Sequence, residues 1–195
     1  LNCLDTAYKI GKEIHNEFQM ASVMKAKGDI YLQQNNFDKA IDLLVKLINK
    51  NIADDQCFQV AGEIYKLQNL PKDAEIIFQK GILKYPNNGP MYNELGILLW
   101  EQKNENAIYY WEKGIEADPN YSKNYFNATG YYSFKKNWLK TILYAETFVN
   151  LESFSDKTNE VKELLLNAYK NIIGKLELTS KKLSSIFYLL IVKEA

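Results

Sequence analysis

The feature that most constrains this chain is a pattern of small and bulky residues that returns about every 34 residues. It is clearest between Asp55 and Asn88, where a bulky residue precedes an alanine-glycine pair and a proline, an alanine and a phenylalanine follow. The glycine of this stretch, Gly62, stands midway between Gly28 and Gly96. A repeat of this length is typical of a solenoid whose unit is a pair of helices joined by a turn.

Small residues recur where the two helices of each unit are expected to cross. Antiparallel helices approach closely only where a side chain is small, so we expect Gly62 of the first helix and Ala74 of the second to face each other. Large residues recur at helical spacing beside these positions, as the apolar stripe of a packed helix should. They are Tyr31, Tyr65, Phe78 and Trp111.

The clearest unit resembles the signature of the tetratricopeptide repeat (TPR) family, which reads W-x2-L-G-x2-Y, then A-x3-F, then P. The residues that carry the resemblance are Phe58, Ala61, Gly62, Tyr65, Ala74, Phe78 and Pro86. The neighbouring stretches repeat this pattern in the same order. The resemblance implies an all-α fold, a right-handed superhelical solenoid of TPR-like helix-turn-helix repeats.

This pattern divides the chain into repeats. Residues 1–20 are predicted to be the second helix of an incomplete repeat, with a helix from Leu4 to Phe18. Four units follow at residues 21–54, 55–88, 89–121 and 122–154, and the fourth is divergent because Thr129 and Thr141 take the glycine and alanine places. Residues 155–195 are predicted to hold a degenerate repeat and a C-terminal capping helix.

Asparagine and proline mark the predicted turns. Asn35 and Asn36 are expected to form the first turn, because asparagine tolerates the left-handed conformation and caps helices. Pro71 and Pro90 stand where a helix would begin. Ala107 follows Ala74 by one residue less than the repeat period, so the turn of the third unit is one residue shorter.

The last stretch, residues 180–193, allows two interpretations. It is apolar from Ile186 to Val192, which is too short to span a bilayer. A capping helix would cover the end of the repeats, whereas an interfacial helix would place Lys181, Lys182 and Lys193 at a membrane surface. A dimer contact is a further alternative.

Composition argues against nucleic acid as a partner and against an enzyme. The formal net charge is zero, and every cationic side chain is a lysine, so the guanidinium groups that read bases are missing. One histidine, His15, and two cysteines, Cys3 and Cys57, offer neither a catalytic triad nor a thiolate cluster. No phosphate-binding loop or other catalytic motif occurs, so we predict no enzyme activity, no cofactor and no metal.

The resemblance implies that the first helices of successive units line a concave groove that binds a partner segment. The predicted groove residues are Gln59, Glu63, Asn93, Glu94, Ile97, Trp100, Glu101, Phe126, Asn127 and Phe134. TPR co-chaperones grip a terminal carboxylate with lysine and asparagine side chains. Here Lys25 matches the first lysine, but Asp29, Val60, Pro90 and Glu94 replace the rest, so we expect a neutral or basic, partly apolar segment.

The predicted function is therefore a non-catalytic protein-protein interaction scaffold that binds a protein or peptide partner. The alternative is an architectural subunit, or a fragment of a larger TPR protein, that assembles through its terminal helices, including self-association through the last one. The chain begins at Leu1 without a methionine or an apolar leader, which fits an excised fragment or a removed leader. The sequence predicts a soluble protein and leaves its compartment open, cytoplasmic or exported.

Overall fold

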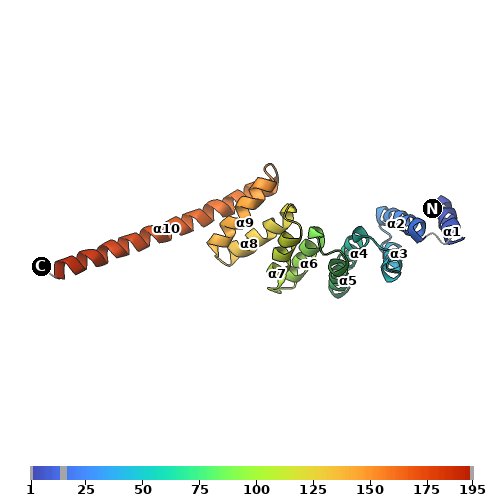
Figure 1. The fold of residues 1–195 in the computed structure, drawn as a ribbon, viewed down its shortest axis with the longest axis horizontal. Coiled ribbons are helices and arrows are strands. Elements are labelled where there is room, and N and C mark those ends of the chain that lie inside the picture. Colours follow the sequence, from blue (N-terminus) through green and yellow to red (C-terminus); the bar gives the residue numbers. More distant parts are fainter. Residues whose placement is uncertain (1, 14–16, 194–195) are drawn as a thin grey trace. The chain divides into compact units, whose positions relative to one another are not determined.

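The computed structural model describes the backbone of residues 2–13 and 17–193, and the side chains of residues 3–10, 22–177 and 179. Over these backbone ranges the chain forms helices joined by turns and contains no strand, which confirms the predicted all-α class (Figure 1). The helices are α1 (Asn2–Glu13), α2 (Glu17–Gln33), α3 (Phe37–Asn49), α4 (Asp55–Leu67), α5 (Pro71–Lys84), α6 (Gly89–Glu101), α7 (Ala107–Ala117), α8 (Ser122–Phe134), α9 (Trp138–Leu151) and α10 (Asp156–Lys193).

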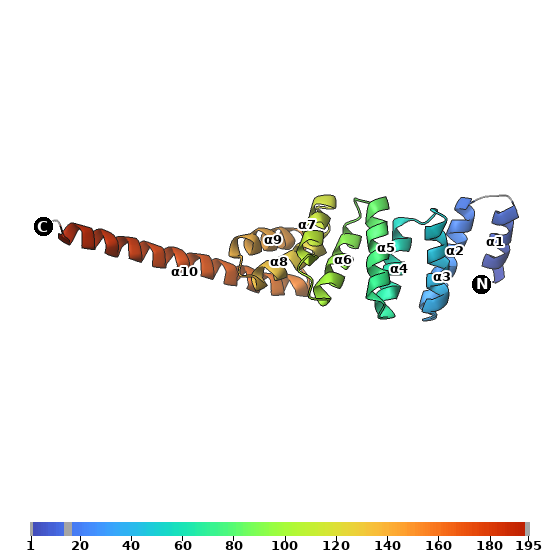
Figure 2. The same cartoon turned by 90° about the horizontal axis from the view of Figure 1, so that it is seen from below.

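The chain divides into two compact units, and the division falls within α7. Unit 1 (Leu1–Tyr110) contains the packed pairs α2–α3 and α4–α5, and each pair also contacts the next helix along the chain. Unit 2 (Trp111–Ala195) contains the pair α8–α9, and α10 packs against both of these helices. Figure 2 shows α4 and α5 side by side in unit 1, and α10 extending past α9 in unit 2.

The crossing of α4 and α5 differs from the predicted one. A Cβ atom on Gly62 would lie 2.4 Å from Cε1 and Cζ of Phe78, and the atoms nearest to it all belong to that ring. The side chain nearest to Gly62 is therefore Phe78, where Ala74 was expected. Phe78 stands one helical turn after Ala74 on the same side of α5, and its longer side chain reaches into the space that glycine leaves open.

The turn inside each helix pair contains one residue in the left-handed backbone conformation. Asn35, Asn69, Lys103 and Lys136 follow the ends of α2, α4, α6 and α8, and their φ angles are 54°, 57°, 60° and 56°. The prediction of a left-handed asparagine at the first turn is confirmed. The third turn is one residue shorter after its left-handed residue: Ala107 follows Lys103 by four positions, whereas Ala74 follows Asn69 by five. The helix α7 begins at Ala107 itself, whereas α5 begins three residues before Ala74.

Side-chain caps and prolines set the helix starts. Asn36, Asp54, Asn88 and Asn137 each accept a hydrogen bond from a backbone N–H of the first turn of α3, α4, α6 and α9. Pro71 begins α5, and α6 also has a proline, Pro90, in its first turn, as predicted. These local signals fix where the helices begin.

The C-terminal part of the chain differs from the predicted helices. At the other end, a helix was expected from Leu4 to Phe18; residues 4–13 of it belong to α1, α2 begins at Glu17, and residues 14–16 lie outside the described residues. Two helices were expected after residue 155, but α10 is continuous over 38 residues. Residues 174–179 contain no proline, and one glycine, Gly174, costs a helix only about 1 kcal/mol.

The role of the last stretch as a cap lies outside the described side chains. Within the described residues, no helix combines the length and apolar character needed to cross a membrane.

Candidate functional site

Side chains of α4 and α6 meet on the surface of unit 1 through polar contacts. Nζ of Lys66 lies 2.7 Å from Oε2 of Glu94, and the two side chains are 22% and 21% exposed. Nε2 of Gln59 donates to Oδ1 of Asn88 at 2.8 Å. Nδ2 of Asn88 in turn donates to Oδ2 of Asp55 at 2.8 Å. Two of the predicted groove residues, Gln59 and Glu94, are therefore held in place by partners on the neighbouring element.

The other predicted groove residues of unit 1 differ in accessibility. Glu63 and Glu101 are exposed, Trp100 is 38% exposed and Ile97 is half-buried. Asn93 is only 1% exposed, and its Nδ2 donates to Oε1 of Glu94 at 3.2 Å. Asn93 therefore orients a surface carboxylate but offers almost no surface of its own to a partner.

Three of the predicted groove residues of unit 1 are carboxylates: Glu63, Glu94 and Glu101. Glu94 is already paired with Lys66. Lys25, the residue that matched the first lysine of the carboxylate-binding pattern, has its Nζ 2.6 Å from Oδ2 of Asp54. The hydrogen bond that Lys25 donates to Asp54 raises the pKa of Lys25. An incoming carboxylate would have to compete with Asp54 for this ammonium group.

In unit 2 the two aromatic residues of the predicted groove differ in exposure. The ring centroid of Phe126 lies 5.6 Å from that of Phe148, which is fully buried, and Nζ of Lys157 lies 4.6 Å from the Phe126 centroid. Phe126 is therefore half-buried between the core and a lysine. Asn127 is half-buried, and Phe134, at the end of α8, is 68% exposed.

A polar cluster in unit 2 was missed by sequence reasoning. Oε1 of Glu112 on α7 accepts hydrogen bonds from the hydroxyls of Tyr132 and Tyr144, each at 2.8 Å, and from Nζ of Lys140 at 3.0 Å. The Tyr132 and Tyr144 rings are stacked with centroids 5.6 Å apart. Nζ of Lys140 also donates to the Tyr132 hydroxyl at 2.7 Å. Three helices are thus joined at one carboxylate.

The surroundings of this carboxylate shift the pKa values of the cluster. Burial acts to raise the pKa of Glu112, but the hydrogen bonds from Tyr144, Lys140 and Tyr132 outweigh it and lower that pKa. Burial and the negative charge of Glu112 raise the pKa of Tyr144. The only sequence signal was the three tyrosines of α8, which do not reveal a partner on α7.

The two cysteines differ in environment. Cys57 is buried, and burial together with the neighbouring Asp54 raises the pKa of its thiol to about 12. Cys3 is exposed. The described residues contain no group of three or more His, Cys, Asp or Glu side chains that could hold a metal ion. His15 lies outside the described residues.

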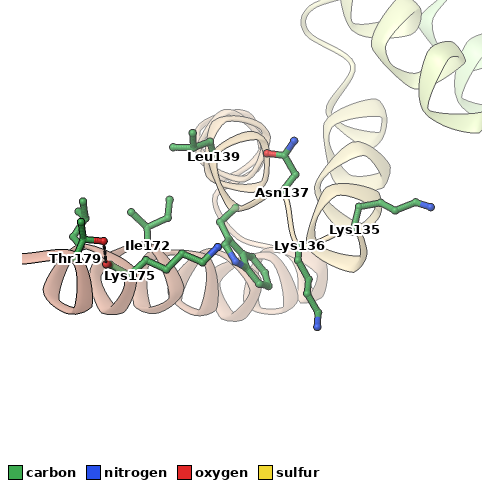
Figure 3. A pocket seen from close by; sticks show the side chains of 9 residues that line it. Lys135, Lys136, Asn137, Leu139, Ile172, Lys175 and Thr179 are labelled. Carbon is green, nitrogen blue, oxygen red and sulfur yellow. Dashed lines mark hydrogen bonds between the residues drawn. The ribbon is translucent and has the colours of Figure 1, made fainter. Parts of the chain in front are cut away.

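A hollow of about 520 Å³ lies in unit 2 between the α8–α9 turn, the start of α9 and the middle of α10. Figure 3 shows Lys135, Lys136 and Asn137 on the turn, Leu139 on α9, and Lys175 on α10. The residues that line it are Lys135, Lys136, Asn137, Trp138, Leu139, Ile172, Lys175, Leu176 and Thr179. None of them was predicted as a site residue.

Comparison with known proteins identifies structural relatives. No family model and no curated protein matches the sequence. The chain is similar to the MamA protein, with a TM-score of 0.61 and 21% identity over 84% of this chain and 94% of that one. It is similar to YrrB, described as a TPR protein with an unusual peptide-binding site, with a TM-score of 0.59 and 18% identity over 83% and 84% of the two chains. The TPR2B domain of yeast Sti1, in complex with pHsp70, matches with a TM-score of 0.53 and 16% identity over 60% and 97%.

Proposed function

We propose that this chain, which has the fold of the tetratricopeptide repeat proteins, is a protein-interaction module that binds a partner segment along the first helices of its repeats. The proposed surface carries no chemistry of its own and serves to hold a partner. Two of the structural relatives support this role, because YrrB is described by its peptide-binding site and the Sti1 domain is in complex with pHsp70.

The observation that carries the proposal is the surface of α4 and α6. Ile97, Trp100 and Glu101 stand about one turn apart on α6, so they share one side of the helix. Trp100 exposes 38% of its surface there. A partly exposed tryptophan beside polar groups is the usual anchor of an interface.

The charges of this surface favour a partner segment with basic side chains. Glu63 and Glu101 are exposed, and Lys66 is engaged with Glu94. A segment with lysine or arginine side chains next to an apolar residue would match these groups, whereas a terminal carboxylate would be repelled. Because exposed charges are screened by salt, the affinity should fall as the salt concentration rises.

Selection of peptides from a random phage-displayed library tests the proposal with the full chain. We expect the selected peptides to be rich in basic and apolar residues, and to lose binding when the chain carries Trp100→Ala. The matched control is Tyr109→Ala, which removes another exposed aromatic residue of unit 1, 55% exposed and outside the proposed surface. If both variants retain the selected peptides equally, or the peptides are acidic, the surface is not the binding site.

Phe126, an aromatic residue of the predicted groove, is a poor position at which to test binding. Its ring packs against Phe148, so its removal would also weaken the core of unit 2. Phe134 is the better choice there, because it is 68% exposed.

An architectural role is the second candidate, and the continuous helix α10 favours it. This helix runs on to Lys193, and its last part is the most apolar stretch of that end of the sequence. If the chain assembles through this segment, removal of residues 180–195 should reduce the mass measured by light scattering from that of an oligomer to that of a monomer. An unchanged monomeric mass in both forms would exclude it.

A further inference from the structure

The turn that leads into α6 contains the sequence Asn88-Gly89. Asn88 is the one asparagine of the 195-residue sequence that is followed by glycine. In such a pair the backbone nitrogen of the glycine can attack the side-chain amide of the asparagine, because glycine has no Cβ atom to hinder the approach and its backbone is permissive. Asn88 is therefore the asparagine that the local sequence leaves most open to deamidation.

The reaction needs only water as a co-reactant. The nitrogen of Gly89 forms a bond to Cγ of Asn88, the bond from Cγ to Nδ2 breaks, and ammonia leaves with the proton of the Gly89 N–H. Water then opens the cyclic imide on either side of its nitrogen. Opening at Cγ leaves aspartate, and opening at the backbone carbonyl carbon leaves isoaspartate, in which the main chain runs through the former side chain.

The fold fixes the orientation of the Asn88 amide. Its Oδ1 accepts from Nε2 of Gln59 at 2.8 Å and from the backbone N–H of Met91 at 3.0 Å, so both lone pairs of this oxygen are engaged. Its Nδ2 donates to Oδ2 of Asp55 at 2.8 Å. Asp55, Gln59 and Asn88 are all half-buried. Attack at Cγ requires the amide to turn toward Gly89, and these hydrogen bonds must break first.

These contacts join two helices. Asp55 and Gln59 stand one turn apart at the start of α4, and Asn88 is the N-cap of α6. We call the contacts of Asn88 with Asp55 and Gln59 the α4–α6 junction. Local opening of a junction requires less free energy than unfolding of the whole chain. The amide is thus released for the reaction whenever the junction opens, while the rest of the chain stays folded.

The products of deamidation do not fit the closed junction. In aspartate a carboxylate oxygen replaces Nδ2, so an acceptor stands where a donor lay 2.8 Å from Oδ2 of Asp55, and two like charges meet. In isoaspartate the main chain is longer by a methylene group, which displaces the oxygen that caps the N–H of Met91. Either product therefore opposes closure of the junction.

We propose that Asn88 is a deamidation site that the closed α4–α6 junction protects, and that its reaction releases this junction irreversibly. The modified chain then carries a permanent record of junction opening. Gln59 also belongs to the predicted groove, and a change in partner binding is the one consequence that rests on the proposed function. The reaction and the stability are measured without a partner, so a failure of the proposed function would leave both unchanged.

Incubation of the full chain at neutral pH, with and without urea, tests the protection. Trypsin releases residues 85–103 by cleavage after Lys84 and Lys103, and tandem mass spectrometry of this peptide follows the conversion of Asn88. We expect deamidation of Asn88 to be at least about tenfold slower in the native chain than in urea. In urea, Gly89→Ala should slow the reaction, because a methyl group then hinders the attack.

A matched pair of variants tests the role of the junction. Gln59→Ala removes one hydrogen bond to Asn88 and should speed deamidation of the native chain at least about threefold. The control is Gln79→Ala, because Gln79 is exposed on α5 and its Nε2 donates to Glu75 of the same helix at 3.1 Å. This control should leave the rate at Asn88 unchanged.

The effect of the product is tested with the variant Asn88→Asp, which should unfold at a lower urea concentration than the wild type. Adding Asp55→Asn to this variant should restore the urea midpoint, because an amide at position 55 donates to the carboxylate at position 88. Asp55→Asn alone should not raise the midpoint, so the two substitutions should be strongly non-additive.

Several results would overturn the proposal. It is wrong if Asn88 deamidates as fast in the native chain as in urea, or stays intact in both. Equal acceleration by Gln59→Ala and Gln79→Ala would show that the junction does not control the reaction. An Asn88→Asp variant that is as stable as the wild type, or that Asp55→Asn does not restore, would exclude the release of the junction.

Discussion

The edge of the Phe78 ring fills the space where a side chain of Gly62 would be, since a Cβ atom there would lie 2.4 Å from two of its carbons. At the equivalent position of the preceding pair, a Cβ atom on Gly28 would lie 3.8 Å from Cδ2 of Leu44, which is ordinary contact. The same repeat position is therefore closed to alanine in one pair and open in the other.

We expect Gly62→Ala to lower the free energy of unfolding by about 1–3 kcal/mol, because the buried ring must move. Gly28→Ala should leave it unchanged or raise it by up to about 1 kcal/mol, because alanine favours helix. Urea unfolding followed by circular dichroism measures both, and Gly62→Leu should be worse than Gly62→Ala. Equal effects of the two alanine variants would show that the crossing is not packed as described.

The left-handed residue Lys103 offers a stabilising change. With a φ of 60°, this lysine adopts a conformation that costs a residue with a Cβ about 1–2 kcal/mol. Lys103→Gly should therefore raise the free energy of unfolding by about 1 kcal/mol, since glycine adopts that conformation freely. Thermal unfolding measures this, and Gln102→Gly is the control, because Gln102 has a φ of −80° and should lose stability instead.

The Glu112 cluster should make stability depend on pH. The folded pKa of Glu112 lies below its unfolded value, so its contribution is complete above about pH 4.3 and is lost as the pH falls through the folded pKa. At pH 7, Glu112→Gln should cost about 1 kcal/mol, a modest value because Lys140 is 45% exposed and solvent screens its charge. The difference in the free energy of unfolding between Glu112→Gln and the wild type should become smaller in acid.

The control for this prediction lies on the same helix. Glu116 pairs with Lys113 at 2.5 Å, but the two side chains are 64% and 42% exposed. Glu116→Gln should change the free energy of unfolding by less than about 0.5 kcal/mol. Urea unfolding at pH 7 and at pH 3 compares the two variants, and similar losses for both would contradict the special role of Glu112.

The two thiols should react at very different rates. Cys3 is exposed, whereas Cys57 is 3% exposed and has a thiol pKa of about 12. Since the thiolate is the reactive form, a thiol reagent at pH 8 should modify Cys3 readily and Cys57 only after unfolding. Counting modified thiols by mass spectrometry with and without urea checks this. Fast modification of Cys57 in the native chain would show that α4 opens readily.

Local features of the fold were predictable from the sequence by itself. The repeat of Gly28, Gly62 and Gly96 indicates paired helices, and the all-α class follows from it. Asn35 and Pro71 mark a turn and a helix start because their own backbone preferences act within a few residues. Short-range preferences of this kind need no knowledge of what packs against them.

The tertiary structure decided which side chains meet. Phe78 rather than Ala74 fills the space at Gly62, and Glu112 collects hydrogen bonds from residues 20 to 32 positions later in the chain. The burial of Asn93 and the hollow between α9 and α10 likewise depend on how helices distant in sequence pack. A periodic pattern identifies the packed side of a helix, but the partner on that side depends on side-chain size and on the position of the neighbouring helix, which the pattern does not encode.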